Sequence, residues 1–222
     1  MNGRRLGGWA VRAVSLGVIG LTAYPPIRLS AQMVGVGVQG VLAGYREQSS
    51  AIRFTGTGVA VSAWAARGKF SADVALASID YEPDETIGRF KARQLDARAR
   101  WYRVSGVSAE VGFTTRTADP EFDAQSVGAI RLGVRGHYLL GPGADITVRA
   151  NYLGGAKFSG GGSSSLGIEM GLGLSVGKTN GRYRLTGDYE FQRFNRVTDN
   201  GSGEVKVPIQ QALARIGVAV GF

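Results

Sequence analysis

The sequence has no cysteine and only one histidine, His137. No disulfide can form, and neither a thiolate nor a histidine cluster is available to bind zinc. The main apolar run, residues 13–23, spans 11 residues, which is too short for a membrane-spanning helix. These absences argue against a zinc enzyme and against a helical span in the mature chain, and they fit an exported protein that does not rely on disulfides.

Glycine, in contrast, is abundant, with 35 of 222 residues. A glycine inside a helix costs about 1 kcal/mol relative to alanine, so this composition argues against a helical protein. The glycines alternate with apolar residues and follow no collagen-type period, which favours β-strands.

The first 31 residues resemble a secretory signal. Arg4, Arg5 and Arg12 precede the apolar run, Tyr24–Pro26 interrupts it, and Leu29–Ala31 offers a cleavage site. We therefore expect a signal peptide at 1–31 and one mature domain at 32–222, with an N-terminal membrane anchor as the alternative. Removal of residues 1–31 takes away four arginines and lowers the net charge from +9 to +5.

From residue 33 onward, apolar side chains recur at every second position. For example, Val34, Val36 and Val38 share one face of a strand, while Gly35 and Gly37 share the other. Alternation of this kind indicates strands whose two faces meet different environments. We expect about ten strands, with eight as the alternative, at 33–45, 53–65, 69–80, 90–103, 107–117, 126–140, 145–153, 165–177, 182–194 and 208–222.

The expected connections alternate in length. Those after even-numbered strands are tight turns, as at residues 66–68, 104–106, 141–144 and 178–181, the last with an Asn-Gly hairpin signal. Those after odd-numbered strands are longer and polar: 46–52, 81–89, 118–125, 154–164 and 195–207. Short turns on one rim and long loops on the other are typical of a transmembrane β-barrel. The predicted fold class is therefore all-β, a transmembrane antiparallel up-and-down barrel.

The chain at this point resembles small, porin-like bacterial outer-membrane barrels. The signal-like start, the meander over 33–222 and a last strand ending in Val218, Val220 and Phe222 carry the resemblance. It implies location in the outer membrane, contact with membrane lipid and lipopolysaccharide, and recognition of the strand ending at Phe222 by the barrel-assembly machinery. It implies no nucleic acid partner and no cofactor, and it leaves the function open because the family includes adhesins, pores, enzymes and anchors.

The barrel must have an apolar outside because hydrocarbon penalises exposed charge. Most charges in the strands fall on the opposite face, and every cation among them is arginine, whose planar fork suits a crowded polar interior. We expect a lumen network of Asp73, Asp96, Arg98, Arg100, Glu110, Arg116, Arg131, Arg135, Arg149, Glu169, Arg184, Asp188, Glu190 and Arg215.

Aromatic side chains mark membrane interfaces. On the lipid face, Phe70, Trp101, Tyr138, Tyr183 and Phe222 are expected near the periplasmic rim. Phe113, Tyr152, Tyr189 and Phe191 are expected towards the outer rim.

We interpret the lumen as filled by its charges and the protein as a non-enzymatic structural or surface-interaction protein. One alternative is a narrow pore for small anionic solutes, favoured by two surplus positive charges and by small lining residues such as Gly35, Gly171 and Gly217. A second alternative is a soluble periplasmic ligand-binding barrel, with an apolar inside and a polar outside.

Few residues indicate catalysis or metal binding. His137 is expected inside the barrel near the periplasmic rim, whereas the proteases in the family that the chain resembles keep their catalytic histidine at the outer rim, so we expect His137 to make a hydrogen bond in the lumen. Gly177–Thr179 lacks the preceding glycine of a phosphate loop, because that position is Leu172. The carboxylates in loops 81–89 and 118–125 could bind a hard cation, but we interpret them as a solvated acidic rim. The glycine-rich loop 154–164 is expected to be flexible.

Overall fold

The computed structural model describes residues 33–48, 53–84, 88–104, 106–164, 166–178, 181–199, 201 and 203–222. The expected signal peptide at 1–31 lies outside these residues. No helix within the described ranges is both long and apolar enough to cross a membrane.

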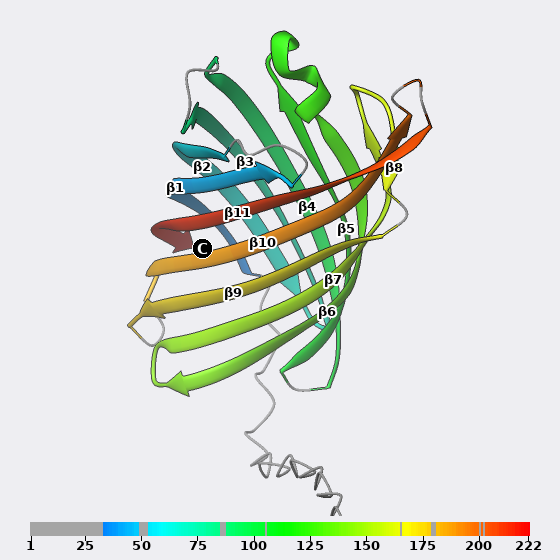
Figure 1. The fold of residues 1–222 in the computed structure, drawn as a ribbon. Coiled ribbons are helices and arrows are strands. Elements are labelled where there is room, and N and C mark those ends of the chain that lie inside the picture. The colour runs from blue at the N-terminus through cyan, green and yellow to red at the C-terminus, as the bar shows by residue number, and fades with distance from the viewer. Residues whose placement is uncertain are drawn as a thin grey trace, which may run out of the picture.

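The described residues form a closed ring of antiparallel strands (Figure 1). Each long strand pairs with the long strands next to it in sequence, so β9 pairs with both β7 and β10, and β11 closes the ring against β1. The predicted up-and-down barrel is therefore confirmed. The ten long strands are β1 (Met33–Glu47), β2 (Arg53–Arg67), β3 (Phe70–Pro83), β4 (Phe90–Val104), β5 (Val107–Ala118), β6 (Val127–Gly141), β7 (Ala144–Phe158), β9 (Gly167–Gly177), β10 (Tyr183–Asp199) and β11 (Glu204–Gly221).

Two shorter elements lie at the rim that carries the longer connections. The 3-10 helix η1 (Pro120–Gln125) follows β5 and stands over the end of the ring (Figure 1), and the two-residue strand β8 (Ser163–Ser164) bridges β7 and β10. We call this end the long-loop rim. The opposite end, the short-turn rim, is formed by tight turns in which Gly68, Gly106 and Gly143 have φ values of 59°, 77° and 82°, a region that glycine enters without steric cost.

The strands extend further towards the long-loop rim than the sequence predicts. The expected loop 195–207 is wrong over most of its length, because β10 and β11 stay paired as far as Asp199 and Glu204. The expected flexible loop 154–164 is also mostly strand. Pairing between β6 and β7 shifts register beyond Gly154, where Gly155 has a φ of 61°. This bulge absorbs the glycines within the strand.

The strands present apolar side chains outward over most of their length. On β6, Ile130, Leu132 and Val134 are 52–56% exposed, whereas Arg131 between them is 0% exposed. The arrangement predicted for a barrel in hydrocarbon, with apolar side chains outside and charged side chains inside, is therefore present at mid-height.

Near the long-loop rim the two faces exchange character. On β3, Ile79 and Tyr81 point inward and are 0% exposed, while Asp80 and Glu82 point outward and are exposed. This part of the ring has the polarity of a water-soluble protein, with an apolar inside. This exchange, which the sequence did not predict, divides the lumen into a charged layer and an apolar layer.

Candidate functional site in the barrel lumen

Arg131 lies at the centre of the charged layer. Its Nε lies 2.6 Å from Glu169 Oε2, and its Nη2 lies 2.7 Å from Asp96 Oδ1 and 3.4 Å from Glu190 Oε1. Asp96, Glu169 and Glu190 are themselves at most 1% exposed. A single guanidinium group thus joins strands β4, β6, β9 and β10 across the lumen.

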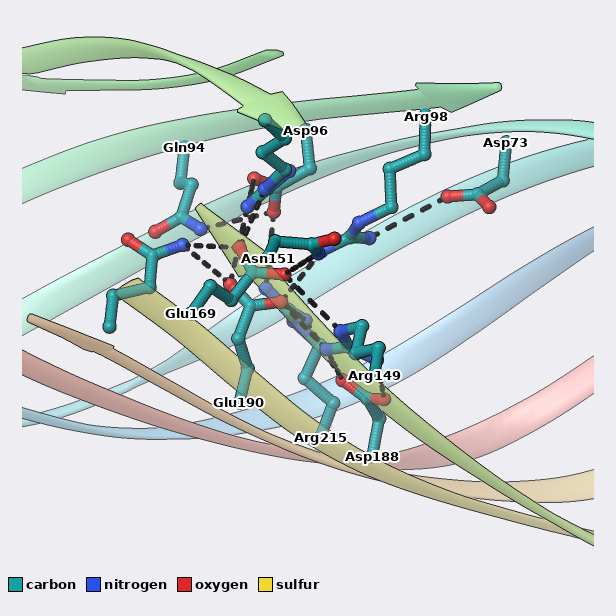
Figure 2. Close-up of polar contacts among 12 residues, drawn as sticks. Asp73, Gln94, Asp96, Arg98, Arg149, Asn151, Glu169, Asp188, Glu190 and Arg215 are labelled. Atoms are coloured by element: carbon teal, nitrogen blue, oxygen red, sulfur yellow. Dashed lines mark hydrogen bonds and ion pairs between the residues drawn. The ribbon is translucent and has the colours of Figure 1, made fainter. Parts of the chain in front are cut away.

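Glu190 is the most connected carboxylate. Besides Arg131, it lies within 2.7 Å of Arg98 Nη2, 2.8 Å of Arg149 Nη2 and 3.4 Å of Arg215 Nη1. Figure 2 shows the side chains of these strands converging on this point from several sides of the ring. Two strands that lie far apart in the sequence, β4 and β11, are linked in this way through one side chain of β10.

The network extends outward from this centre. Arg149 makes a two-pronged contact with Asp188, at 2.8 and 3.0 Å, and Arg100 Nε lies 2.8 Å from Glu110 Oε2. Asp73 accepts a hydrogen bond from Arg100, and its Oδ2 forms an ion pair with Arg98 Nη1 at 3.6 Å. We use the term central network for this connected set: Asp73, Asp96, Glu110, Glu169, Asp188, Glu190, Arg98, Arg100, Arg131, Arg149 and Arg215.

Buried amides that the sequence analysis did not select complete the central network. Asn151 donates to Glu110 and Glu169 at 2.8 and 3.0 Å, Gln192 donates to Glu190 at 2.7 Å, and Gln94 donates to Asp96 at 3.0 Å. Each amide lies on the same strand face as the predicted charges, so the alternation pattern could have found them. Their donors satisfy carboxylate lone pairs that would otherwise be buried without a partner.

Three of the predicted lumen residues lie outside the central network. Arg116 bonds to Gln211 and to the carbonyl oxygen of Gln125 nearer the long-loop rim. Arg184 pairs with Asp145 near the short-turn rim. Arg135 faces inward but has no carboxylate within ion-pair distance in the described ranges.

His137 lies on the inner face of β6 near the short-turn rim. Its Nε2 is 3.3 Å from Asp145 Oδ1. Asp145 also pairs with Arg184, so the carboxylate is shared between two basic groups. This arrangement corresponds to the polar lumen contact expected for His137.

Glycines on the inner face accommodate large neighbouring side chains. A Cβ built on Gly171 would lie 2.4 Å from Arg149 Cζ, and one on Gly35 would lie 2.5 Å from a ring carbon of Trp64. Gly171 and Gly35, two of the small residues that suggested an open channel, therefore make room for the side chains of Arg149 and Trp64.

We expect Gly171→Val to lower the free energy of unfolding by about 1–3 kcal/mol, because the added atoms displace the Arg149 guanidinium from its carboxylates. Denaturant unfolding in lipid vesicles measures the change. Gly187→Val is the matched control: Gly187 lies on β10 and faces outward, and an added Cβ meets no atom within 4 Å. Equal loss in both variants would contradict the role assigned to Gly171.

The apolar layer lies inside the ring between the central network and the long-loop rim. We call its ring cluster the aromatic layer: Tyr45, Phe54, Tyr81, Phe90 and Phe122. The Phe90 ring stacks against Tyr81 at 4.7 Å and against Phe122 at 5.0 Å between centroids. Phe122 belongs to η1, so the connection after β5 contributes a ring to the aromatic layer.

Two buried arginines link the connections at the long-loop rim to buried aromatic rings. The Arg116 guanidinium lies 4.7 Å from the Tyr45 ring centroid and donates to the Gln125 carbonyl oxygen of η1. Arg196 lies 5.0 Å from the Phe158 ring and donates to the carbonyl oxygens of Gly160 and Gly161. The sequence analysis placed Arg196 in a loop and so missed this role.

The nine residues predicted as interface aromatics lie on the outer surface. Phe191 is half-buried, and the other eight are 43–69% exposed: Phe70, Trp101, Tyr138, Tyr183, Phe222, Phe113, Tyr152 and Tyr189. Their role at membrane interfaces remains a prediction.

The acidic connections do not form a metal site in the described part of the chain, where no group of three potential ligands is placed to hold a cation. Glu82 and Asp80 instead face Arg89 and Lys91 at 3.4 and 3.2 Å. Part of the loop 81–89, including Glu85, lies outside the described residues.

Comparison with known proteins finds no matching protein-family model and no matching curated protein. Among solved structures, the chain is similar to Neisserial surface protein A, with 15% identity, 85% of this chain and 97% of that chain covered, and a TM-score of 0.44. The translocator domain of the autotransporter NalP from Neisseria meningitidis matches with 15% identity, 88% and 90% coverage, and a TM-score of 0.43. The outer-membrane protein OprG from Pseudomonas aeruginosa matches with 9% identity, 87% and 96% coverage, and a TM-score of 0.36. These similarities assign no function to the chain.

Proposed function

We propose that the protein is an integral bacterial outer-membrane barrel with a closed lumen and a structural or surface-interaction role. The observation that carries the proposal is the pair of layers inside the ring: a central network with Arg131 and Glu190 at 0% exposure, and an aromatic layer with Tyr81 at 0% exposure. A solute would have to displace both layers to cross.

The apolar outer surface supports the membrane location. Large contiguous apolar patches are rare on soluble monomers and mark sites of membrane or protein contact. Here every long strand contributes outward apolar side chains at mid-height, among them Val38 at 64% and Val59 at 62% exposure. A ring of this kind satisfies its own backbone groups, which hydrocarbon requires of any spanning sheet.

The two layers and the apolar outer surface argue against the narrow pore and against the soluble ligand-binding barrel. A narrow anion pore would need a continuous path through the central network, whose arginines are already engaged by carboxylates. A soluble ligand-binding barrel would need a polar exterior at mid-height. We further propose that the barrel is not an enzyme, since the single histidine is engaged with a carboxylate shared with Arg184. We also propose that the outer surface contacts lipopolysaccharide. The assembly machinery, in this proposal, recognises the strand that ends at Phe222.

Planar-bilayer recording tests the closed lumen. The refolded barrel is expected to give no unitary conductance steps, because both layers fill the lumen. Heat-modifiable gel migration of the protein recovered from the same lipid shows that the barrel was folded. Clear unitary steps from the folded protein would contradict the proposal and favour the narrow pore.

A further inference from the structure

On β1 and β10, near the closure of the ring, the outer surface changes from apolar to cationic towards the long-loop rim. On β1, the outward sequence runs from Val38 and Leu42, which are 64% and 62% exposed, through Gly44 to Arg46. On β10, outward Tyr189 and Phe191 are followed by Arg193. This level marks the end of the surface suited to hydrocarbon, and a membrane has its headgroups at such a boundary.

Three arginines lie side by side at this boundary, across the strands that close the ring. Arg193 of β10 pairs with Gln210 of β11, Gln210 pairs with Arg46 of β1, and Arg46 pairs with Arg53 of β2. Directly paired residues point to the same face, and adjacent strands lie about 4.8 Å apart. The row Arg193–Gln210–Arg46–Arg53 therefore presents three guanidinium groups within about 15 Å on the outer surface.

The row carries positive charge that the described residues do not neutralise. None of the three arginines has a carboxylate within ion-pair distance there, and Arg46 Nε is buried without a hydrogen-bond partner. On β3, by contrast, Glu82 and Asp80 are paired with Arg89 and Lys91. Asp84, whose backbone N–H donates to the Arg53 carbonyl oxygen, bounds the row on that side.

We propose that the row Arg193–Gln210–Arg46–Arg53 binds the phosphate groups of a multiply phosphorylated membrane lipid, whose acyl chains lie against the apolar surface below. The inference rests on the proposed membrane location. Guanidinium groups bind phosphate through two parallel hydrogen bonds. Gln210 supplies a neutral amide between the cations, and the exposed Leu42 and Tyr189 below offer the apolar contact that a free phosphate ion would not use.

Lipid retention measured by native mass spectrometry tests the inference. The refolded protein is loaded with diphosphoryl lipid A or with phosphatidylethanolamine. The variant R46Q/R53Q/R193Q is compared with R67Q/R103Q/R182Q, which removes three exposed arginines at the short-turn rim. The wild type and the short-turn variant are expected to retain diphosphoryl lipid A, and R46Q/R53Q/R193Q is expected to retain about tenfold less. Phosphatidylethanolamine retention is expected to stay equal in all three.

Equal retention of lipid A by R46Q/R53Q/R193Q and the wild type would overturn the inference, as would equal loss in the two variants. Binding of inorganic phosphate that depends on the row, with lipid retention unchanged, would assign the row to the free ion instead. These substitutions lie on the surface, so folding is checked by heat-modifiable migration. A folded barrel that inserts but shows no selective retention overturns this inference alone, whereas a barrel that does not enter lipid overturns the proposed function.

Discussion

Replacement of Arg131 by alanine is expected to lower the free energy of unfolding by about 3–5 kcal/mol, which is the usual cost of removing one partner from a buried charge cluster. The variant leaves Asp96, Glu169 and Glu190 facing one another with one cation fewer. Each carboxylate remains buried after losing one cationic partner. The loss therefore combines the missing ion pairs with the cost of buried carboxylate oxygens that keep fewer partners.

Urea unfolding in lipid vesicles, followed by tryptophan fluorescence, measures this loss. Arg135→Ala is the matched control, since Arg135 faces the lumen from the same strand without an ion pair in the described ranges. It is expected to cost about 1 kcal/mol. Similar losses for the two variants would show that Arg131 has no special role in holding the strands together.

Val134→Arg is the second substitution with a large expected effect. Val134 lies at the middle of β6, points outward and is 55% exposed. An arginine on the lipid face near the bilayer midplane costs about 2–4 kcal/mol, and the cost falls to about 0–1 kcal/mol near the interfaces.

The same unfolding measurement compares Val134→Arg with Val104→Arg. Val104 ends β4 at the short-turn rim and is 59% exposed, so the two positions differ in depth rather than in exposure. A loss at Val134 several times larger than that at Val104 is expected. If both substitutions are neutral, the outer surface faces water and the membrane location is wrong.

Most of the barrel could be predicted from the sequence because period-two alternation reports directly on the two faces of a strand. Val34, Val36 and Val38 face outward as expected, and the turns at Gly68 and Gly143 lie where the glycines predicted them. The central network follows from the same alternation, since a charge excluded from hydrocarbon has only the lumen to occupy.

The apolar layer was not predicted because the alternation keeps its period while its polarity reverses. Ile79 and Tyr81 are inward on β3, yet Val74 and Leu76 on the same strand are outward. The reversal depends on where the strand leaves the hydrocarbon, and the sequence contains no direct marker of that depth. Knowing only that apolar residues face lipid, we placed the outer part of several strands in loops.

Ion-pair partners could not be predicted for a related reason. The sequence shows that Arg98, Arg149 and Arg215 face inward, but their convergence on Glu190 depends on the register across strands that are far apart in the chain. Arg196 is a further case, because its partners are backbone carbonyl oxygens, which carry no sequence signal.

Site-directed spin labelling along β2 tests most directly whether the outer surface faces hydrocarbon at mid-height. The absence of native cysteine makes single-cysteine labels possible. Labels at Val59, Val61 and Ala63 are expected to be accessible to oxygen and not to a water-soluble nickel chelate. A label at Arg53, at the level of the cationic row, is expected to be accessible to the chelate, and labels at the inward Ala60 and Ser62 to neither reagent. Access of the chelate to Val59, Val61 and Ala63 as readily as to position 53 would contradict a barrel that faces hydrocarbon at mid-height and water near its long-loop rim.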